Sequence, residues 1–291
     1  MRLISSNKAL ALLMLVLLLF NDSTRAESDI SYVQHSIYPQ QIISQNKQRG
    51  LSSLKSKTQQ SQESTENIPI TVIAQEVTVR VIGDSGVGSG VIIERKGKTY
   101  TVLTCRHVIA NSKSNQVQIL TNDGFTQTAT WNLSRQLNDI DLVQLQFTSD
   151  SNYKIAAIGE TSLLKVGDTV YAVGFPNWHW KNPKTIQNTR DWGLKAYKLT
   201  TGIIGMMPEN YLKRGYQIGI TNNIYRGMSG GPLFNQQGQL VGINGRSKYP
   251  LLKGKAFRYQ NGKLVATNVA GKMQTLSWAI PITRIRELNK K

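Results

Sequence analysis

The chain has 291 residues, of which 40% are hydrophobic and 18% are charged, and these are ordinary values for a globular protein with a sizeable core. Its 35 Lys and Arg residues against 17 Asp and Glu residues give a formal net charge of +18, which favours anionic partners or surfaces. No helix-turn-helix, zinc-finger or RNA-binding motif accompanies this charge, so we expect no sequence-specific contact with nucleic acid. Cys105 is the only cysteine, which excludes an intramolecular disulfide and a cysteine-based metal site.

The first 26 residues have the composition of a secretory signal peptide. Arg2 and Lys8 precede an apolar run of 12 residues, Ala9–Phe20, and small residues follow at Thr24 and Ala26. The run is shorter than the roughly 20 residues that a helix needs to span a bilayer. We therefore expect cleavage after residue 26 and a secreted or periplasmic protein. An uncleaved membrane anchor is the alternative.

The next stretch, residues 27–67, is rich in Gln, Ser and Asn and has no sustained hydrophobic period. Such a composition cannot bury enough apolar surface to offset the entropy of ordering. It indicates a flexible linker or a pro-segment, and the sequence does not separate the two.

Residues 68–291 form the predicted domain, and its pattern from about Ile68 onward is one of short strands. Val77, Val79 and Val81 alternate with polar residues, as in a half-buried strand, and a hairpin is predicted from 87–93 and 99–104 across the turn at residues 96–98. Further strands are expected at 117–120, 141–147, 170–175, 199–204, 216–221, 240–244 and 276–280. A single helix is expected from about Thr283 to Asn289. Many short strands indicate an all-β protein of closed barrels, with the boundary between them near 160–200.

The segment Tyr225–Phe234 contains one serine, Ser229, flanked by three glycines and followed by a proline. Glycines are costly to order, so three of them around one hydroxyl suggest unusual backbone angles. A nucleophilic serine needs such a backbone, because its hydroxyl must be exposed while nearby amide N–H groups face a developing oxyanion. The alternative is a Gly-rich turn before a strand. A similar segment around Ser85 lacks the second glycine and the proline, and we interpret it as a turn.

Among the histidines, His107 is the best candidate for a general base. It follows the predicted strand 99–104, and a strand end holds a side chain rigidly at the edge of a cleft. His35 lies in the predicted linker, and His179 lies in a loop-like aromatic segment where a surface or packing role is expected.

An acid that orients the histidine is expected at the mouth of the strand 141–147. Asp141 directly precedes the apolar run, whereas Asp139 lies two residues farther out on the same face of an extended chain. We favour Asp141, with Asp139 as the alternative.

These motifs occur in the order Thr104–Ile109, Asp141–Leu145, Gly227–Pro232, and together they resemble the chymotrypsin-like (trypsin-fold) serine peptidases. The resemblance is to the disulfide-free bacterial trypsin-like and HtrA-like branch, and it covers roughly residues 70–291. Val87–Ile93 is similar to the strand that precedes the histidine strand there, and Trp278–Pro281 to the closing strand. The resemblance implies two perpendicular six-stranded β-barrels with a short C-terminal helix and the active site between the barrels.

Carried over to this chain, the resemblance makes Ser229 the nucleophile, His107 the general base and acid, and Asp141 the group that orients His107. The N–H groups of Gly227 and Ser229 form the oxyanion hole, and no metal or organic cofactor is required. The expected function is an exported serine endopeptidase that acts on proteins or peptides through an acyl-enzyme. A catalytically silent binding protein for peptides or an anionic partner is the alternative, and a hydrolase of small esters is a third.

The resemblance also implies where substrate specificity is set. Asn223 falls at the base of the primary specificity pocket, where it is not the acid that selects Arg or Lys. Asn244 stands where glutamyl-specific relatives carry histidine, and Gly245 lines the wall where the substrate backbone pairs as an added strand. Met228 replaces the Asn or Asp that commonly precedes the serine, so activation by a freed N-terminus is not expected. The chain ends soon after the predicted terminal helix, so we expect no PDZ module. We also expect a monomer.

Residues 246–272 contain seven basic residues and no acidic one: Arg246, Lys248, Lys253, Lys255, Arg258, Lys263 and Lys272. The segment is either a solvated hairpin or loop, or a basic rim that attracts acidic substrates or an anionic surface.

Overall fold

The structure, a computed structural model, describes residues 68–84, 86–131, 139–182, 184–250 and 257–285. The chain divides into two units, 1–62 and 63–291, and all of the described residues belong to the second. The predicted signal peptide, the predicted linker or pro-segment, His35 and Ser85 therefore lie outside the described residues.

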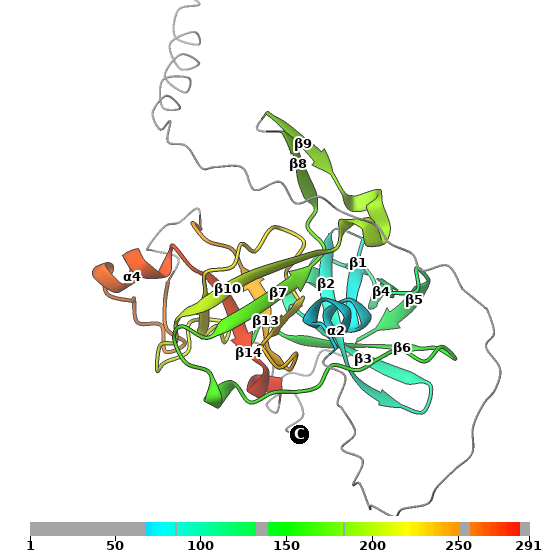
Figure 1. Cartoon of the computed structure of the whole chain (residues 1–291), viewed down its shortest axis with the longest axis horizontal. Helices are drawn as coiled ribbons and strands as arrows, with labels where there is room; N and C mark the ends of the chain where they lie inside the picture. Colours follow the sequence, from blue (N-terminus) through cyan, green and yellow to red (C-terminus); the bar gives the residue numbers. More distant parts are fainter. Residues whose placement is uncertain (1–67, 85, 132–138, 183, 251–256, 286–291) are drawn as a thin grey trace, which may run out of the picture. The chain divides into compact units, whose positions relative to one another are not determined.

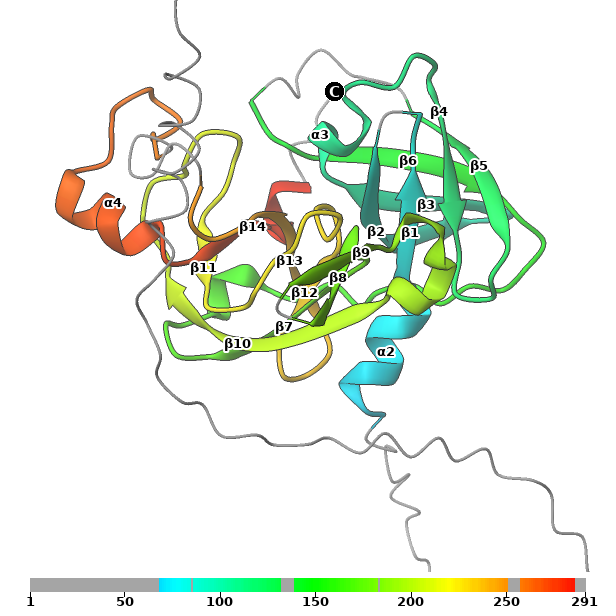
Figure 2. The same cartoon turned by 90° about the horizontal axis from the view of Figure 1, so that it is seen from above.

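The described strands form two closed barrels of six strands and a separate hairpin (Figures 1 and 2). The first barrel has the strand order β1-β2-β3-β6-β5-β4 and consists of β1 (Thr78–Ile82), β2 (Val87–Lys96), β3 (Thr99–Thr104), β4 (Gln116–Leu120), β5 (Thr126–Thr130) and β6 (Val143–Thr148). The second has the order β10-β11-β14-β13-β12-β7 and consists of β7 (Thr169–Gly174), β10 (Lys198–Met206), β11 (Ile218–Ile220), β12 (Pro232–Phe234), β13 (Leu240–Arg246) and β14 (Ser277–Pro281). The prediction of an all-β fold with two six-stranded barrels is confirmed.

Short helices and the hairpin complete the described part of the domain. The α-helices are α2 (Ile70–Val77), α3 (Arg106–Ile109) and α4 (Thr267–Met273), and the 3-10 helices are η2 (Thr161–Leu163), η3 (Arg190–Ala196) and η5 (Ile282–Arg284). The hairpin consists of β8 (Trp178–Asn182) and β9 (Thr185–Asn188). Figure 2 shows α3 at the rim of the first barrel and α4 at the side of the second.

The two barrels have separate cores, built by alternate residues of their strands. The first is filled from all around the barrel, by Val79, Val81, Ile92, Tyr100, Val102, Ile119, Val143, Leu145 and Phe147, and the second by Val170, Ala172, Ile204, Ile218, Ile220, Leu233, Val241 and Ala279. A third cluster, with Leu103, Phe234, Ile243 and Trp278 among its members, contains residues of both barrels. The barrels are therefore joined by an apolar interface.

The predicted hairpin of β2 and β3 is confirmed. Lys96 pairs with Thr99, so the turn is made by two residues. Gly97, the first of them, has a φ of +61°, which is a conformation that glycine adopts without strain.

The expectation of strands from about Ile68 onward is wrong at its start, because residues 70–77 form helix α2. Ile70, Ile73, Ala74 and Val77 recur at helical spacing and lie on the more buried face, with Ala74 fully buried. The valine alternation at residues 77–81 concealed this pattern, since Val77 ends the helix. The following strand β1 is buried on both faces rather than half-buried, because Arg80 is also enclosed and donates to Gly193 O at 3.0 Å and Thr189 O at 2.9 Å.

Other elements differ from the prediction for recognisable reasons. The segment around His179 is a hairpin rather than a loop, and all the residues that form β8 and β9 are exposed, so they carry no burial pattern. Strand β5 was missed because only one of its residues, Ala129, is buried. The stretch expected as a terminal helix begins as the 3-10 helix η5, and residues 286–289 lie outside the described part. Helix α4 is an additional helix at the C-terminal end of the basic segment 246–272.

Among the described helices, none combines the length and the apolar character needed to cross a membrane.

The docking of α2 is tested by placing one charge on each of its two faces. Ala74→Glu buries a carboxylate and should lower the free energy of unfolding by about 3 kcal/mol. Val72→Glu, on the exposed side of the same helix, should change it by about 0.5 kcal/mol or less. Urea unfolding followed by circular dichroism measures both, and equal effects would show that the helix does not pack on the barrels.

Candidate active site

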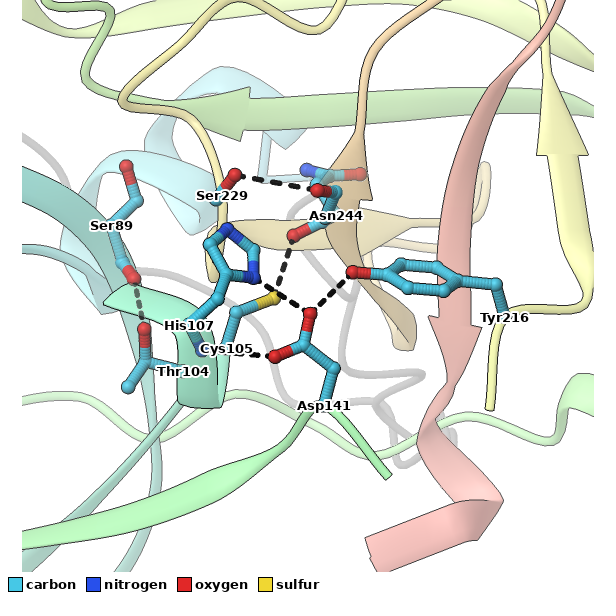
Figure 3. Close-up of polar contacts among 9 residues, drawn as sticks. Ser89, Thr104, Cys105, His107, Asp141, Tyr216, Ser229 and Asn244 are labelled. Atoms are coloured by element: carbon cyan, nitrogen blue, oxygen red, sulfur yellow. Dashed lines mark hydrogen bonds and ion pairs between the residues drawn. The ribbon is translucent and has the colours of Figure 1, made fainter. Parts of the chain in front are cut away.

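The predicted site residues come from both barrels. His107 lies in α3, directly after β3, and Asp141 lies two residues before β6, so both belong to the first barrel. Ser229 lies in the loop between β11 and β12 of the second. His107 and Ser229 line one pocket with a volume of about 160 Å³. The fold therefore brings together three side chains that are far apart in the sequence (Figure 3).

His107 and Asp141 form a doubly bonded pair. The His107 Nδ1 and Asp141 Oδ2 atoms are 2.6 Å apart, and the backbone N–H of His107 donates to Asp141 Oδ1 at 2.9 Å. An ionised carboxylate can only accept hydrogen bonds, so Nδ1 carries a ring proton, and Nε2 is an acceptor when the ring is neutral. The His107 side chain is 35% exposed, whereas Asp139 is exposed and makes no bond to the ring, so the geometry favours Asp141 over Asp139 as the partner of the histidine.

A tyrosine from the second barrel completes the surroundings of Asp141. The hydroxyl of Tyr216, which is fully buried, donates to Asp141 Oδ2 at 2.6 Å. Burial alone would raise the pKa of Asp141, but the hydrogen bonds from His107 and Tyr216 and the charge of His107 lower it below its ordinary value. Burial raises the pKa of Tyr216 well above its usual range, so the phenol stays protonated and remains a donor. The sequence does not single out Tyr216, because it begins the predicted strand 216–221, and tyrosine in a strand is usually a core residue.

Cys105 lies behind this pair and is also fully buried. Its thiol donates to Asn244 O at 3.2 Å, and burial raises its pKa well above its ordinary value. Cys105, His107 and Asp141 offer ligand atoms within 4.8 Å of one another, a spacing that could suit a metal. However, the thiol is held protonated and the imidazole and carboxylate are already bonded to each other. The arrangement fits a structural role for Cys105 as a small buried residue.

The loop around Ser229 requires its glycines. Gly227 has a φ of +102° and Gly230 a φ of +87°. A Cβ at Gly230 would collide with Thr104 Oγ1 and Ser89 O, so the close approach of the two barrels leaves no room for a side chain. The Ser229 hydroxyl donates to Gly245 O at 3.5 Å in this structure.

Along residues 227–230, the N–H groups alternate between those with and those without a hydrogen-bond partner among the described residues. Those of Met228 and Gly230 donate to Tyr225 O at 2.9 Å and Asn244 O at 2.7 Å. Within the described part of the chain, the N–H groups of Gly227 and Ser229 have no hydrogen-bond partner. These are the two groups that the sequence analysis assigned to the oxyanion hole.

The peptide bond before Gly227 is held by Asn177. The N–H of Asn177 donates to Arg226 O at 2.7 Å. In a trans peptide the C=O and N–H groups point in opposite directions, so this bond directs the N–H of Gly227 away from Asn177.

Ser89 of strand β2 ties the first barrel to this loop. Its N–H donates to Ser229 O at 2.9 Å and its hydroxyl donates to Gly227 O at 2.8 Å, while the same hydroxyl accepts from Phe175 N–H at 2.8 Å. Thr104 Oγ1 donates to Ser89 O at 2.6 Å. The sequence predicted no role for Ser89. The two glycines beside it, at 88 and 90, were the available signal, because glycine within a strand often marks a close backbone approach.

The predicted specificity residues lie in different surroundings. Asn223 is exposed. Asn244 is fully buried, and its amide donates inside the barrel to Pro232 O at 2.8 Å and Val173 O at 3.3 Å. Gly245 lies against Tyr216, whose ring would collide with a Cβ at this position.

The basic segment 246–272 is not one continuous loop. Arg246 belongs to β13, and its guanidinium lies over the rings of Tyr216 and Phe257 at 5.6 and 5.0 Å. Arg258, Lys263 and Lys272 are exposed, Lys248 is partly buried, and Lys253 and Lys255 lie outside the described residues. The other described histidine, His179, is exposed on β8 and packs against Trp192 with their ring centres 5.6 Å apart.

Removing the Tyr216 hydroxyl should have a pH-dependent effect on stability. Asp141 has a depressed pKa, so its contribution is present above the ordinary carboxyl pKa of 3.8 and is lost as the pH falls through the lowered value. At neutral pH, Tyr216→Phe should cost about 2 kcal/mol, and this cost should shrink below pH about 4 as Asp141 is protonated.

Tyr100→Phe is the matched control, because the buried Tyr100 hydroxyl donates to a neutral carbonyl, Ser151 O, at 2.7 Å. Its cost of about 1 kcal/mol should not change over the same pH range. Urea unfolding at a series of pH values measures both variants. If the stability cost of Tyr216→Phe were also constant over this pH range, it would contradict a hydrogen bond from Tyr216 to an ionised Asp141.

Residues 88–243, more than half of the chain, match the model of the family described as "Trypsin-like peptidase domain". The chain is similar to the mitochondrial serine protease HTRA2 of Drosophila grimshawi, with 31% identity over 160 residues, covering 54% of this chain and 33% of that protein. It is also similar to the serine protease Do-like HtrA of Bacillus subtilis, with 33% identity over 162 residues, covering 55% of this chain and 33% of that protein.

The chain thus spans about a third of the length of these curated relatives. Among solved structures, it resembles a serine endoprotease from Yersinia pestis with a TM-score of 0.50 and 24% identity, covering 75% of this chain and 63% of the other, a likeness that concerns the fold. The family match agrees with the two six-stranded barrels and with the His107–Asp141 pair. The chain belongs to the family of proteins with a trypsin-like peptidase domain.

Proposed function

We propose that this protein is a serine endopeptidase that acts through Ser229, His107 and Asp141. The observation that carries the proposal is the pocket beside His107. It is lined by Ser229 and Gly227, and the N–H groups of both residues have no hydrogen-bond partner among the described residues. A serine, a base and two free N–H donors are what acyl transfer needs.

In the proposed reaction, His107 Nε2 accepts the proton of Ser229 as Oγ attacks the scissile carbonyl. The N–H groups of Gly227 and Ser229 donate to the oxygen that becomes negative. His107 then gives the proton to the leaving amine, and an acyl-enzyme remains on Ser229. A water molecule, activated by the same histidine, hydrolyses the acyl-enzyme and regenerates the serine.

The surroundings of the pair suit this cycle. The pKa of Asp141 is lowered, so its carboxylate stays ionised while the imidazole carries the proton from Ser229. The Ser229 hydroxyl, which donates to Gly245 O, has to turn from this acceptor towards Nε2 before attack. A rotation about one side-chain torsion between staggered positions is sufficient for such a turn.

The substrates that we propose are proteins or peptides, in line with relatives that are named serine proteases. We further propose that the protein acts outside the cytoplasm, secreted or in the periplasm. This rests on the apolar run Ala9–Phe20 behind a basic start, which has the pattern of a signal peptide.

A fluorophosphonate probe tests the proposal, because a serine that a neighbouring base activates displaces its fluoride and forms a phosphonate ester. Wild-type protein should be labelled on Ser229, and Ser229→Ala should not be labelled. Asp141→Asn should slow labelling about 10⁴-fold, because the imidazole loses the acceptor that fixes its tautomer. Asp139→Asn makes the same chemical change at an exposed carboxylate and should leave the rate within about threefold.

Mass spectrometry identifies the labelled residue, and circular dichroism confirms that the variants are folded. An unlabelled, folded wild-type protein would refute the enzyme proposal. A loss of labelling in Asp139→Asn alone would show that the other acid orients His107.

A further inference from the structure

We propose that the pocket beside Ser229 is a subsite for a carboxylate on the leaving-group side of the scissile bond. This rests on the proposed function and adds a substrate class to it. Two arginines, Arg190 and Arg226, line the pocket together with His107, Gly227 and Ser229. None of the lining residues is acidic.

The position of the pocket assigns it to the leaving group. Gly245, on the strand edge where the acyl part of a substrate would pair, is bonded to the Ser229 hydroxyl but does not line this pocket. The pocket lies beyond Gly227 instead, with Val87 of the first barrel on its wall. Consider a bound substrate whose scissile carbonyl accepts from the N–H groups of Gly227 and Ser229 and whose acyl part lies along β13. The residues after the scissile bond of such a substrate would therefore enter this pocket.

The two guanidinium groups are available for a ligand. Both arginines are exposed, and among the described residues no carboxylate lies within 4.0 Å of either guanidinium. Asp191 follows Arg190 in the chain, and its charge acts on the buried Arg80. Arg226 is partly held in place, since its guanidinium lies 5.8 Å from the centre of the Trp178 ring. Arginine binds a carboxylate through two parallel N–H bonds, which makes this pair suited to that group.

Asn177 gives the pocket a fixed wall. It lines the pocket and is buried, and its amide nitrogen donates to Val87 O at 3.3 Å, which fixes the orientation of the group. Its Oδ1 atom is buried against Gly227 and is closed to a ligand. The pocket thus offers a fixed wall and a pair of cations for an acidic group.

The carboxylate has two possible sources, an Asp or Glu side chain or the free C-terminus of a short leaving group. Digestion of a peptide library by the wild-type protein identifies the cleaved bonds. We expect Asp and Glu to be enriched at the first two positions after the bond, or free C-termini to be enriched there. A double variant, Arg190→Gln with Arg226→Gln, should lose this enrichment.

Matched peptides then give the size of the effect and separate the sources. In the first pair, both peptides are amidated at the C-terminus, and the residue after the scissile bond is Asp in one and Asn in the other. In the second pair, both peptides end shortly after the scissile bond, one with a free carboxylate and the other with an amide. In at least one pair, the kcat/KM value of the peptide with the carboxylate should be roughly tenfold higher than that of its matched amide. The ratio of the two values should approach one in the double variant and at high salt. Arg95→Gln removes an exposed arginine of the β2–β3 hairpin that does not line the pocket and should keep the ratio.

Binding of the same peptides to Ser229→Ala, followed by fluorescence anisotropy, gives an independent readout that needs no turnover. A roughly tenfold ratio of Kd values that falls in the double variant supports the subsite even if no bond is cleaved. Equal Kd values for carboxylate and amide peptides would overturn it, and so would a ratio that the double variant keeps. Labelling of Ser229 by the fluorophosphonate probe reports separately on the proposed activity.

Discussion

The site depends on how the loop of Ser229 is held against the first barrel, and Ser89 makes most of that connection. One residue of β2 binds Ser229 O through its N–H and Gly227 O through its hydroxyl, and it accepts from Phe175 of the second barrel. These bonds are buried, where they are strong and where leaving one unmade is costly. They fix the loop that would supply the nucleophile and both N–H donors relative to β2, which pairs with the strand that precedes His107.

Two further buried bonds cross between the barrels at the same place. Tyr216 of the second barrel donates to Asp141, and Cys105 of the first donates to Asn244 O. Each of these groups is kept neutral by burial, so a single negative charge lies behind the imidazole. The outer side of the imidazole faces the pocket with its two arginines. The charge distribution therefore places a fixed anion behind the base and free cations in front of it.

The sequence allowed the fold class to be predicted, and it indicated the residues of the proposed site, because both leave local signals. Alternating apolar residues mark the barrel strands, and the glycines around Ser229 mark a loop whose φ values and close contacts admit no side chain. Helix α2 was missed because Val77 also fits the alternation of the following strand. Another reason explains why the sequence did not indicate roles for Tyr216, Asn177, Arg190 and Arg226. Their roles depend on contacts between residues far apart in the chain, and no pattern around any of them indicates these contacts.

The connection through Ser89 is tested most directly by Ser89→Ala, with Thr161→Val as a control. Thr161 is also buried and donates to a backbone carbonyl, Val241 O, at 2.9 Å, but it lies outside the site. Both variants should lose about 1–3 kcal/mol of stability, since each removes a buried hydrogen bond. Only Ser89→Ala should slow fluorophosphonate labelling of Ser229, by at least about tenfold, because the oxyanion donors lose their support. Labelling of Ser89→Ala at the wild-type rate would contradict the account.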